Sequence, residues 1–177
     1  MTKRKGLHSH YEIMFENFLR ENNFLYIAIN EAKRPVFNEE RIKNFDFIVV
    51  SKSGKLILID IKGKQFPYKS EYGKNYWENW IGIDDGKFLK MWSKIFGNNA
   101  IGILVFAYLI KYKEDEKYFK DIFTFKRNKY GLVAIEINEY LKHSKPRSKS
   151  GKGTFNAISV SREKLSKLVR PISNFLK

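Results

Sequence analysis

The chain has 177 residues, with 34 lysines and arginines against 19 acidic residues, which gives a formal net charge of +15. Hydrophobic residues make up 43% and aromatic residues 16% of the sequence, which excludes intrinsic disorder and predicts one compact domain with its own core. The absence of cysteine excludes disulfides, thiolate zinc sites and cysteine nucleophiles.

The large positive charge is the first indication of a partner, because self-repulsion at this level costs stability unless a polyanion or salt relieves it. Nucleic acid is the favoured partner and a solvated basic surface is the alternative. We expect no membrane partner, since no basic amphipathic helix is evident and the longest apolar run, Ile101 to Ile110, is about half a membrane span. The basic residues 1–10 lead into no apolar segment, so we expect a cytoplasmic protein.

The first third of the chain predicts a helix followed by a hairpin. Ser9 and Glu12 have the spacing of a capping box, and apolar residues then recur at helical spacing, which predicts a helix over about residues 9–22. A first strand is predicted over 24–30, followed by a charged connection. Residues 45–50 and 55–62 are rich in β-branched residues and flank a glycine-containing turn, which predicts an antiparallel hairpin.

The rest of the sequence predicts a succession of loops, strands and helices. They are a polar, aromatic loop over 63–79, a helix capped by Asp84 or Asp85 and ending near Gly97, a strand buried on both faces over 101–110, a hairpin over 119–125 and 130–137, a mobile loop over 142–153, a strand over 154–160 and a short helix over 161–169. This order predicts an α/β (mixed α+β) protein with a mixed sheet flanked by helices.

Two carboxylates and a lysine carry the predicted chemistry. Asp60 and Lys62 lie two apart in a strand, so their side chains point to the same face. If the hairpin turns about Ser53, Asp46 stands directly opposite Asp60 with Cβ atoms about 5 Å apart, where like charges repel. A divalent cation such as Mg²⁺ relieves this repulsion, and Lys62 can then orient the attacking water. The alternative is a solvated sheet face with an Asp–Lys pair.

These residues, together with a first helix that carries Glu12 and Glu16, resemble the motif of the PD-(D/E)XK nuclease superfamily. The segment from His10 to Glu16 also resembles the HYExAFE pattern of a set of bacterial proteins. Phe45 stands where that superfamily often has proline, and Asp60 stands where it often has glutamate. The similarity to the bacterial set extends over nearly the whole chain, through Asn30–Arg34, Gly63, Trp80, Asp84-Asp85, Trp92, Phe96-Gly97 and Arg147-Ser148.

The resemblance implies a restriction-endonuclease-like α/β/α core with a central mixed sheet over residues 1–112, and a C-terminal β-rich extension over 113–177 packed on the same domain. It implies an Mg²⁺ (or Mn²⁺) ion held by Asp46, Asp60, the backbone carbonyl of Ile61 and Glu12. The implied catalytic residues are Asp46, Asp60, Lys62 and Glu12 or Glu16. A capping role for Glu12, a solvated position for Glu16 and a helix-start position for His10 are the open alternatives.

Basic residues near this motif predict contacts with DNA, because cations contact phosphates and aromatic rings stack on exposed bases. The candidates are Lys33, Arg34, Lys64, Lys69, Lys74, Lys145, Arg147 and Lys149. For Trp77, Trp80 and Trp92, packing in the core is favoured over stacking on bases. The predicted function is a metal-dependent DNA endonuclease. An RNA substrate, a non-catalytic nucleic-acid-binding module, a nuclease subunit of a larger complex, a homodimer and a partner protein stay open.

Overall fold

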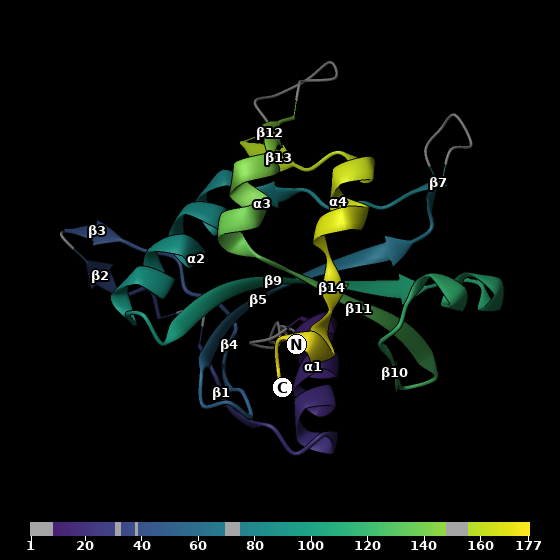
Figure 1. The fold of residues 1–177 in the computed structure, drawn as a ribbon, viewed down its shortest axis with the longest axis horizontal. Helices are drawn as coiled ribbons and strands as arrows, with labels where there is room; N and C mark the ends of the chain where they lie inside the picture. Colours follow the sequence, from purple (N-terminus) through teal and green to yellow (C-terminus); the bar gives the residue numbers. More distant parts are fainter. Residues whose placement is uncertain (1–8, 31–32, 38, 70–74, 148–155) are drawn as a thin grey trace, which may run out of the picture.

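A mixed seven-stranded sheet forms the centre of the computed structural model, which describes residues 9–30, 33–37, 39–69, 75–147 and 156–177 (Figure 1). Along the sheet the order is β1 (Leu25–Ala28), β4 (Phe47–Val50), β5 (Leu56–Phe66), β9 (Ala100–Ile110), β11 (Asn128–Glu136) and β10 (Ile122–Phe125), and β14 (Arg170–Pro171) also pairs with β11. Strands β5 and β9 are parallel and the other neighbours are antiparallel. The predicted mixed sheet is confirmed.

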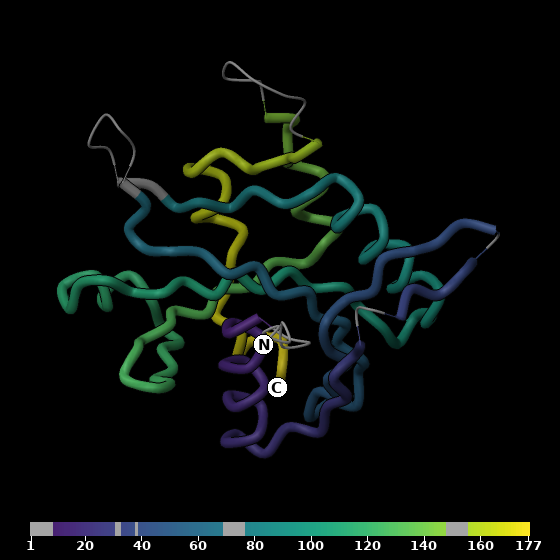
Figure 2. The backbone as a smooth tube through the Cα atoms, turned by 180° about the vertical axis from the view of Figure 1, so that it is seen from behind, coloured from purple at the N-terminus to yellow at the C-terminus, as the bar shows by residue number. Residues whose placement is uncertain are grey.

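Helices cover both faces of this sheet. Helix α1 (His10–Glu21) and the C-terminal residues lie on one face, and α2 (Ile83–Ile95), α3 (Ile137–His143) and α4 (Arg162–Leu168) lie on the other (Figures 1 and 2). The side chains of β5 point alternately to the two faces of the sheet. Ile59 therefore packs with Phe15 of α1, whereas Leu58 belongs to the core beneath α2. The predicted α/β class is therefore confirmed, and the assignment to a restriction-endonuclease-like fold stays a prediction.

The first helix begins as predicted. The Ser9 side chain accepts a hydrogen bond from the Glu12 backbone N–H at 3.3 Å, and Glu12 Oε1 accepts one from the Ser9 N–H at 3.1 Å. These two bonds satisfy donors that a helix start otherwise leaves without partners.

The hairpin of β4 and β5 has the predicted register, with four pairs from Phe47 opposite Ile59 to Val50 opposite Leu56. Strand β5 is longer than predicted and continues to Phe66, where a loop was expected. It pairs with β9 along its whole length, from Leu56 beside Ala100 to Phe66 beside Ile110. This long-range pairing keeps the polar residues after Ile61 in an extended strand.

Three local predictions differ from the structure. Gly82 is the N-cap of α2, so Asp84 and Asp85 lie in its first turn rather than at the cap. Helix α3 occupies residues expected to end a strand and begin a loop, because Ile137 and Tyr140 both turn into the core. The charged connection before β4 contains a small hairpin of β2 (Val36–Phe37) and β3 (Glu40–Arg41).

The remaining elements are short. They are β6 (Tyr68–Lys69), β7 (Asn75–Tyr76), β8 (Ile81–Gly82), the 3-10 helix η1 (Lys113–Tyr118), β12 (Lys145–Pro146), β13 (Ala157–Ser159) and the 3-10 helix η2 (Ile172–Asn174). The expected hairpin of β10 and β11 is present. The region from residue 113 onward, expected as an extension, contributes β10, β11 and β14 to the central sheet. Within the described ranges, no helix is long and apolar enough to cross a membrane.

Gly63 is required where α1 crosses β5. A Cβ atom at this position would lie 2.0 Å from the Tyr11 ring, which is itself held by a 3.1 Å hydrogen bond from its hydroxyl to the Lys64 carbonyl oxygen. We expect Gly63→Ala to lower the free energy of unfolding by about 1–3 kcal/mol, the usual cost of overpacking, as measured by urea denaturation. In the Gly63→Ala/Tyr11→Ala double variant the loss should be smaller than the sum of the single losses. Additive losses would show that the ring is not the obstacle.

Candidate active site

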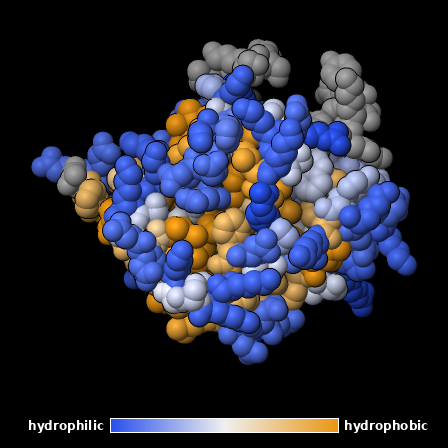
Figure 3. All heavy atoms as spheres, viewed as in Figure 1, coloured by the Kyte–Doolittle hydropathy of each residue, from blue (hydrophilic) through white to orange (hydrophobic). Residues whose placement is uncertain are grey.

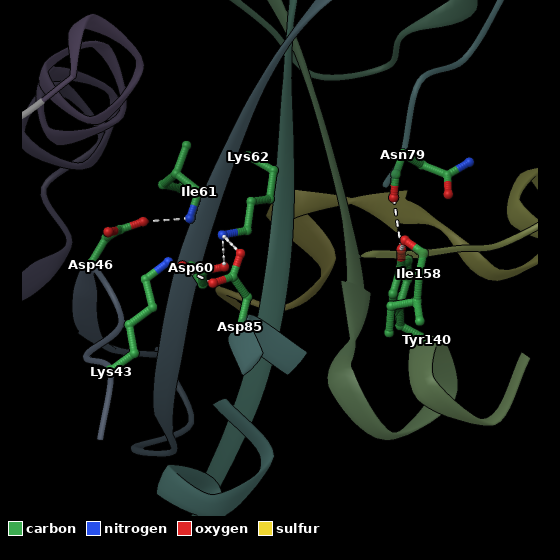
Figure 4. Close-up of polar contacts among 9 residues, drawn as sticks. All are labelled: Lys43, Asp46, Asp60, Ile61, Lys62, Asn79, Asp85, Tyr140 and Ile158. Carbon is green, nitrogen blue, oxygen red and sulfur yellow. Dashed lines mark hydrogen bonds and ion pairs between the residues drawn. The ribbon is translucent and has the colours of Figure 1, made fainter. Parts of the chain in front are cut away.

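Four charged side chains form a chain of ion pairs on the α2 face of β5 (Figure 4). Lys62 Nζ lies 2.7 Å from Asp60 Oδ2 and 2.7 Å from Asp85 Oδ2, and Lys43 Nζ donates to Asp85 Oδ1 at 2.5 Å. Asp60 is only 4% exposed and the Lys62 side chain 15%. This ion-pair chain, Lys43–Asp85–Lys62–Asp60, is therefore largely shielded from water.

Three separate elements position the ion-pair chain. The strand alternation of β5 places Asp60 and Lys62 on one face, as predicted, and the first turn of α2 brings Asp85 over them. Trp92 of α2 donates its indole N–H to the Lys43 carbonyl oxygen at 2.9 Å, which fixes the segment before β4 against the helix. The sequence interpretation missed Asp85 as a site residue, although the Asp84-Asp85 pair was noted as a helix start.

The charges in this network shift one another's protonation. Burial alone lowers the pKa of Lys62, but Asp60 and Asp85 outweigh it and the net shift of the pKa is upward. Burial raises the pKa of Asp85, yet Lys62 and Lys43 reverse this, so its pKa falls below the usual range. For Asp60 the loss of hydration dominates over the attraction of Lys62, and its pKa is raised. Lys62 is thus held as a cation between two carboxyl groups.

Asp46 lies at the point where β4 leaves β5. Its Oδ2 accepts a hydrogen bond from the Ile61 N–H at 2.5 Å, and its own N–H donates to the Ile59 carbonyl oxygen at 2.8 Å. The carboxylate thus extends the hydrogen-bond ladder by one step beyond Phe47. Because the Ile61 N–H belongs to the peptide that joins Asp60 to Ile61, the Asp46 carboxylate lies against the backbone of Asp60, and it is 3% exposed.

The helix-one acids have other partners. Glu12 caps its own helix through Ser9, and Glu16 accepts hydrogen bonds from Arg20 at 3.3 Å and from the Tyr26 hydroxyl at 3.0 Å. The His10 ring lies against the Tyr11 ring, with centroids 3.9 Å apart. A role for Glu12 or Glu16 beside the metal stays a prediction.

The donor set suits a hard divalent cation. Asp46, just before β4, and Asp60 of β5 supply two buried carboxylates, and the partner of Asp60 Oδ2 is the Lys62 ammonium at 2.7 Å. Mg²⁺ in proteins commonly takes one or two carboxylates and completes its shell with water and phosphate oxygens. No group of three or more Asp, Glu, His or Cys side chains suited to a metal occurs in the described part of the chain. Asp46, Asp60 and the Ile61 carbonyl therefore fit Mg²⁺ only if water and substrate supply the other ligands.

The predicted DNA-contacting cations fall into three groups. Lys33, Arg34, Lys145 and Arg147 are exposed, as a phosphate contact requires. Lys64 is only 8% exposed. Lys74, Lys149 and the side chain of Lys69 lie outside the described residues.

The three tryptophans have different surroundings. Trp77 packs against Phe66 with ring centroids 4.6 Å apart, and Trp92 packs against Phe45 at 5.7 Å, so both partly buried rings pack against the core, as predicted. Trp80 differs, because Lys64 Nζ lies 3.8 Å from its ring centroid and the Arg147 guanidinium carbon 6.0 Å from it. A half-buried indole with two cations near it keeps open, for Trp80, the alternative of stacking on bases.

Comparisons with known proteins supply no family for this arrangement: no protein-family model matches the chain, and no curated protein matches it. The resemblance to PD-(D/E)XK nucleases therefore remains a prediction based on the motif.

Two substitutions of Asp46 distinguish the effect of its hydrogen bond from the effect of its charge. Asp46→Ala removes the acceptor of a buried N–H, and we expect the free energy of unfolding to fall by about 1–3 kcal/mol. Asp46→Asn keeps an oxygen acceptor and should lose less. Urea denaturation without divalent cations measures both variants. Equal losses would mean that the charge, and not the hydrogen bond, holds Asp46 in place.

Lys64 should make stability depend on pH. Burial lowers the pKa of Lys64 from 10.5 to about 8; the Glu78 carboxylate opposes this shift, and the positive charges of Lys62 and Arg147 add to it. Below pH 8 the buried cation opposes folding. Between about pH 8 and 10.5 the unfolded chain binds a proton that the folded chain lacks, so the contribution of Lys64 to stability rises with pH.

We therefore expect the free energy of unfolding of wild type, relative to that of Lys64→Met, to increase between pH 7 and pH 10. Urea denaturation at several pH values measures this difference. Lys55→Met, at an exposed position just before β5, is the control and should give a constant difference. A constant difference for Lys64→Met as well would contradict the depressed pKa.

Proposed function

We propose that this protein is a metal-dependent DNA endonuclease that hydrolyses phosphodiester bonds. The observation that supports this most is the buried Asp60-Ile61-Lys62 segment of β5. The Ile61 N–H of this segment donates a hydrogen bond to the Asp46 carboxylate. Two carboxylates and a cation around one stretch of β5 are the groups that metal-assisted phosphoryl chemistry needs, and the net charge of +15 fits a polyanionic substrate.

Asp46, Asp60 and the Ile61 carbonyl would hold Mg²⁺ or Mn²⁺. When bound, such an ion acts as a Lewis acid on the phosphate and lowers the pKa of water. The Lys62 ammonium group has three protons, and its contacts with Asp60 and Asp85 use two of them. The third is available to orient a water molecule or to stabilise the charge that develops on a phosphate oxygen. Asp85 is then a positioning residue, which keeps Lys62 charged and in place.

A non-catalytic nucleic-acid-binding module is the second candidate. The mutual pairing of Lys43, Asp85, Lys62 and Asp60 favours it, since these charges satisfy one another and tie α2 to β5. In this case Mg²⁺ should leave the melting temperature unchanged. A metal that binds the folded state should instead raise the melting temperature of wild type but not that of Asp60→Asn.

Cleavage assays test the proposed activity. Purified protein should cut plasmid, single-stranded or branched DNA with Mg²⁺ or Mn²⁺, and EDTA should abolish cutting. We expect Asp60→Asn and Lys62→Met to reduce the rate at least about 100-fold, the usual effect of removing a group that stabilises transition-state charge. An RNA substrate of the same sequence decides between deoxyribonuclease and ribonuclease activity.

Two neighbouring aspartates on α2 provide a matched pair for the same assay. Asp85→Asn removes a partner of Lys62 and should lower the rate, whereas Asp84→Asn changes an exposed carboxylate and should not. Circular dichroism confirms that each variant is folded. Failure of folded wild type to cut any of these substrates with either metal would overturn the proposal, as would full activity in Asp60→Asn.

A further inference from the structure

Two neighbouring cavities lie on the α4 side of the molecule. The smaller has a volume of about 180 Å³ and is lined by Trp80, Arg147 and Arg162 among others. The larger has about 650 Å³ and is lined by Tyr118, Leu165 and Val169 among others. Trp77 and Arg162 line both cavities, so the two are neighbours. Figure 3 shows apolar surface between the polar side chains around α3 and α4.

The smaller cavity connects to the candidate active site through β5. Lys64 follows Lys62 by two residues on the same face of the strand, and its ammonium lies against the Trp80 ring. The positive charges of Lys62 and Arg147 both lie close enough to Lys64 to lower its pKa. Lys62, Lys64, Trp80 and Arg147 thus form a strip that runs from the candidate site to the smaller cavity.

The segment from Trp77 to Trp80 is held in place by hydrogen bonds. Asn79, between Trp77 and Trp80 in sequence, is 6% exposed and pairs with the Val160 backbone through two hydrogen bonds, of 2.9 Å and 3.0 Å. The hydroxyl of Tyr140 reaches the carbonyl oxygens of Asn79 at 2.7 Å and of Ile158 at 3.1 Å (Figure 4). Helix α3 and β13 therefore fix the segment that carries both tryptophans.

The chemistry of the lining selects a ligand with flat rings and negative charges. Aromatic walls stack on bases irrespective of their sequence, and arginines contact the phosphates that join them. The carboxylates of Glu78 and Glu163 also line the cavities, where they disfavour phosphates and can accept hydrogen bonds from base amino groups. The larger volume falls in the range of about 300–1,000 Å³ that small-molecule pockets have. Bases stacked inside a duplex cannot enter such concave sites, whereas unpaired bases can.

We propose that these two cavities form a binding track for unpaired bases of single-stranded DNA that adjoins the scissile phosphate. The inference rests on the proposed function for the nature of the ligand, and it specifies the substrate as DNA with a single-stranded segment. Trp80 supplies the stacking surface nearest to Lys62, Arg147 and Arg162 contact the backbone, and Trp77 with Tyr118 forms the wall of the far cavity.

Binding without metal tests the track separately from catalysis. Fluorescence anisotropy with a labelled oligothymidine, in EDTA, gives the affinity of wild type and of Trp80→Leu, Arg147→Gln and Arg162→Gln. We expect Trp80→Leu to weaken binding about 5- to 100-fold, the range for loss of one stacked base. Each arginine variant should weaken binding and reduce the slope of log affinity against log salt by about one. An oligouridine of equal length shows whether the track prefers DNA to RNA.

Controls separate the track from general loss of charge or fold. Arg127→Gln, in the turn between β10 and β11, removes a cation outside the cavities and should leave the affinity of the oligothymidine within about twofold. Trp80→Phe keeps a ring and should retain most of the affinity. A blunt duplex should bind all of these variants about equally well. If Trp80→Leu and both arginine variants bind oligothymidine as tightly as wild type, or lose duplex binding to the same extent, the proposal is overturned.

A cleavage comparison separates failure of this inference from failure of the proposed function. Wild type should cut a duplex with a single-stranded tail faster than the matched blunt duplex, and Trp80→Leu should lose this preference while still cutting the blunt substrate. Cleavage with no difference between substrates would overturn the track and leave the nuclease standing. Track-dependent binding of oligothymidine without any cleavage would overturn the nuclease and leave the track standing.

Discussion

The parallel pairing of β5 with β9 is the constraint on which the rest of the molecule depends. Eleven residues of each strand run side by side, from Leu56 beside Ala100 to Phe66 beside Ile110. Helix α2 lies between the two strands in sequence and packs over both of them, which brings Asp85 onto Lys62. Without the full length of this pairing, β5 would end near Ile61. The polar residues after it would then have no fixed place above the core.

The ion-pair chain on this strand is costly for a protein of this size. Buried charges lose hydration, and well-packed apolar residues of equal volume often stabilise such positions at least as well. Asp60 shows the cost directly, because burial raises its pKa even beside Lys62. The cost is easier to understand if the charges have a chemical task, which agrees with the proposed function.

Sequence periodicity predicted those parts of the site that depend on local rules. The turn after Ser51 and the alternation of two strands gave the register that puts Asp46 at the end of the hairpin ladder, and the capping box gave the start of α1. Asp85 could not be predicted in the same way, since its contact with Lys62 follows from the packing of a helix on a sheet. The same holds for α3, whose seven residues have a weak helical signal and are fixed by burial of Tyr140. For Trp80 the sequence favoured packing in the core over stacking on bases, and only tertiary structure shows its cationic neighbours.

The hydrogen bonds of the Tyr140 hydroxyl affect how a ligand would bind to the neighbouring cavities. This hydroxyl is a neutral donor at physiological pH, and its one proton is shared between the carbonyl oxygens of Asn79 at 2.7 Å and of Ile158 at 3.1 Å. The segment of Trp77 and Trp80 is therefore held in place, with no ligand bound, by hydrogen bonds to Tyr140 and Val160. Because this cavity wall is already arranged, binding a ligand costs little of the conformational entropy of the protein. Its contacts can then contribute to affinity almost in full, and the bound state should resemble the free one closely in this region.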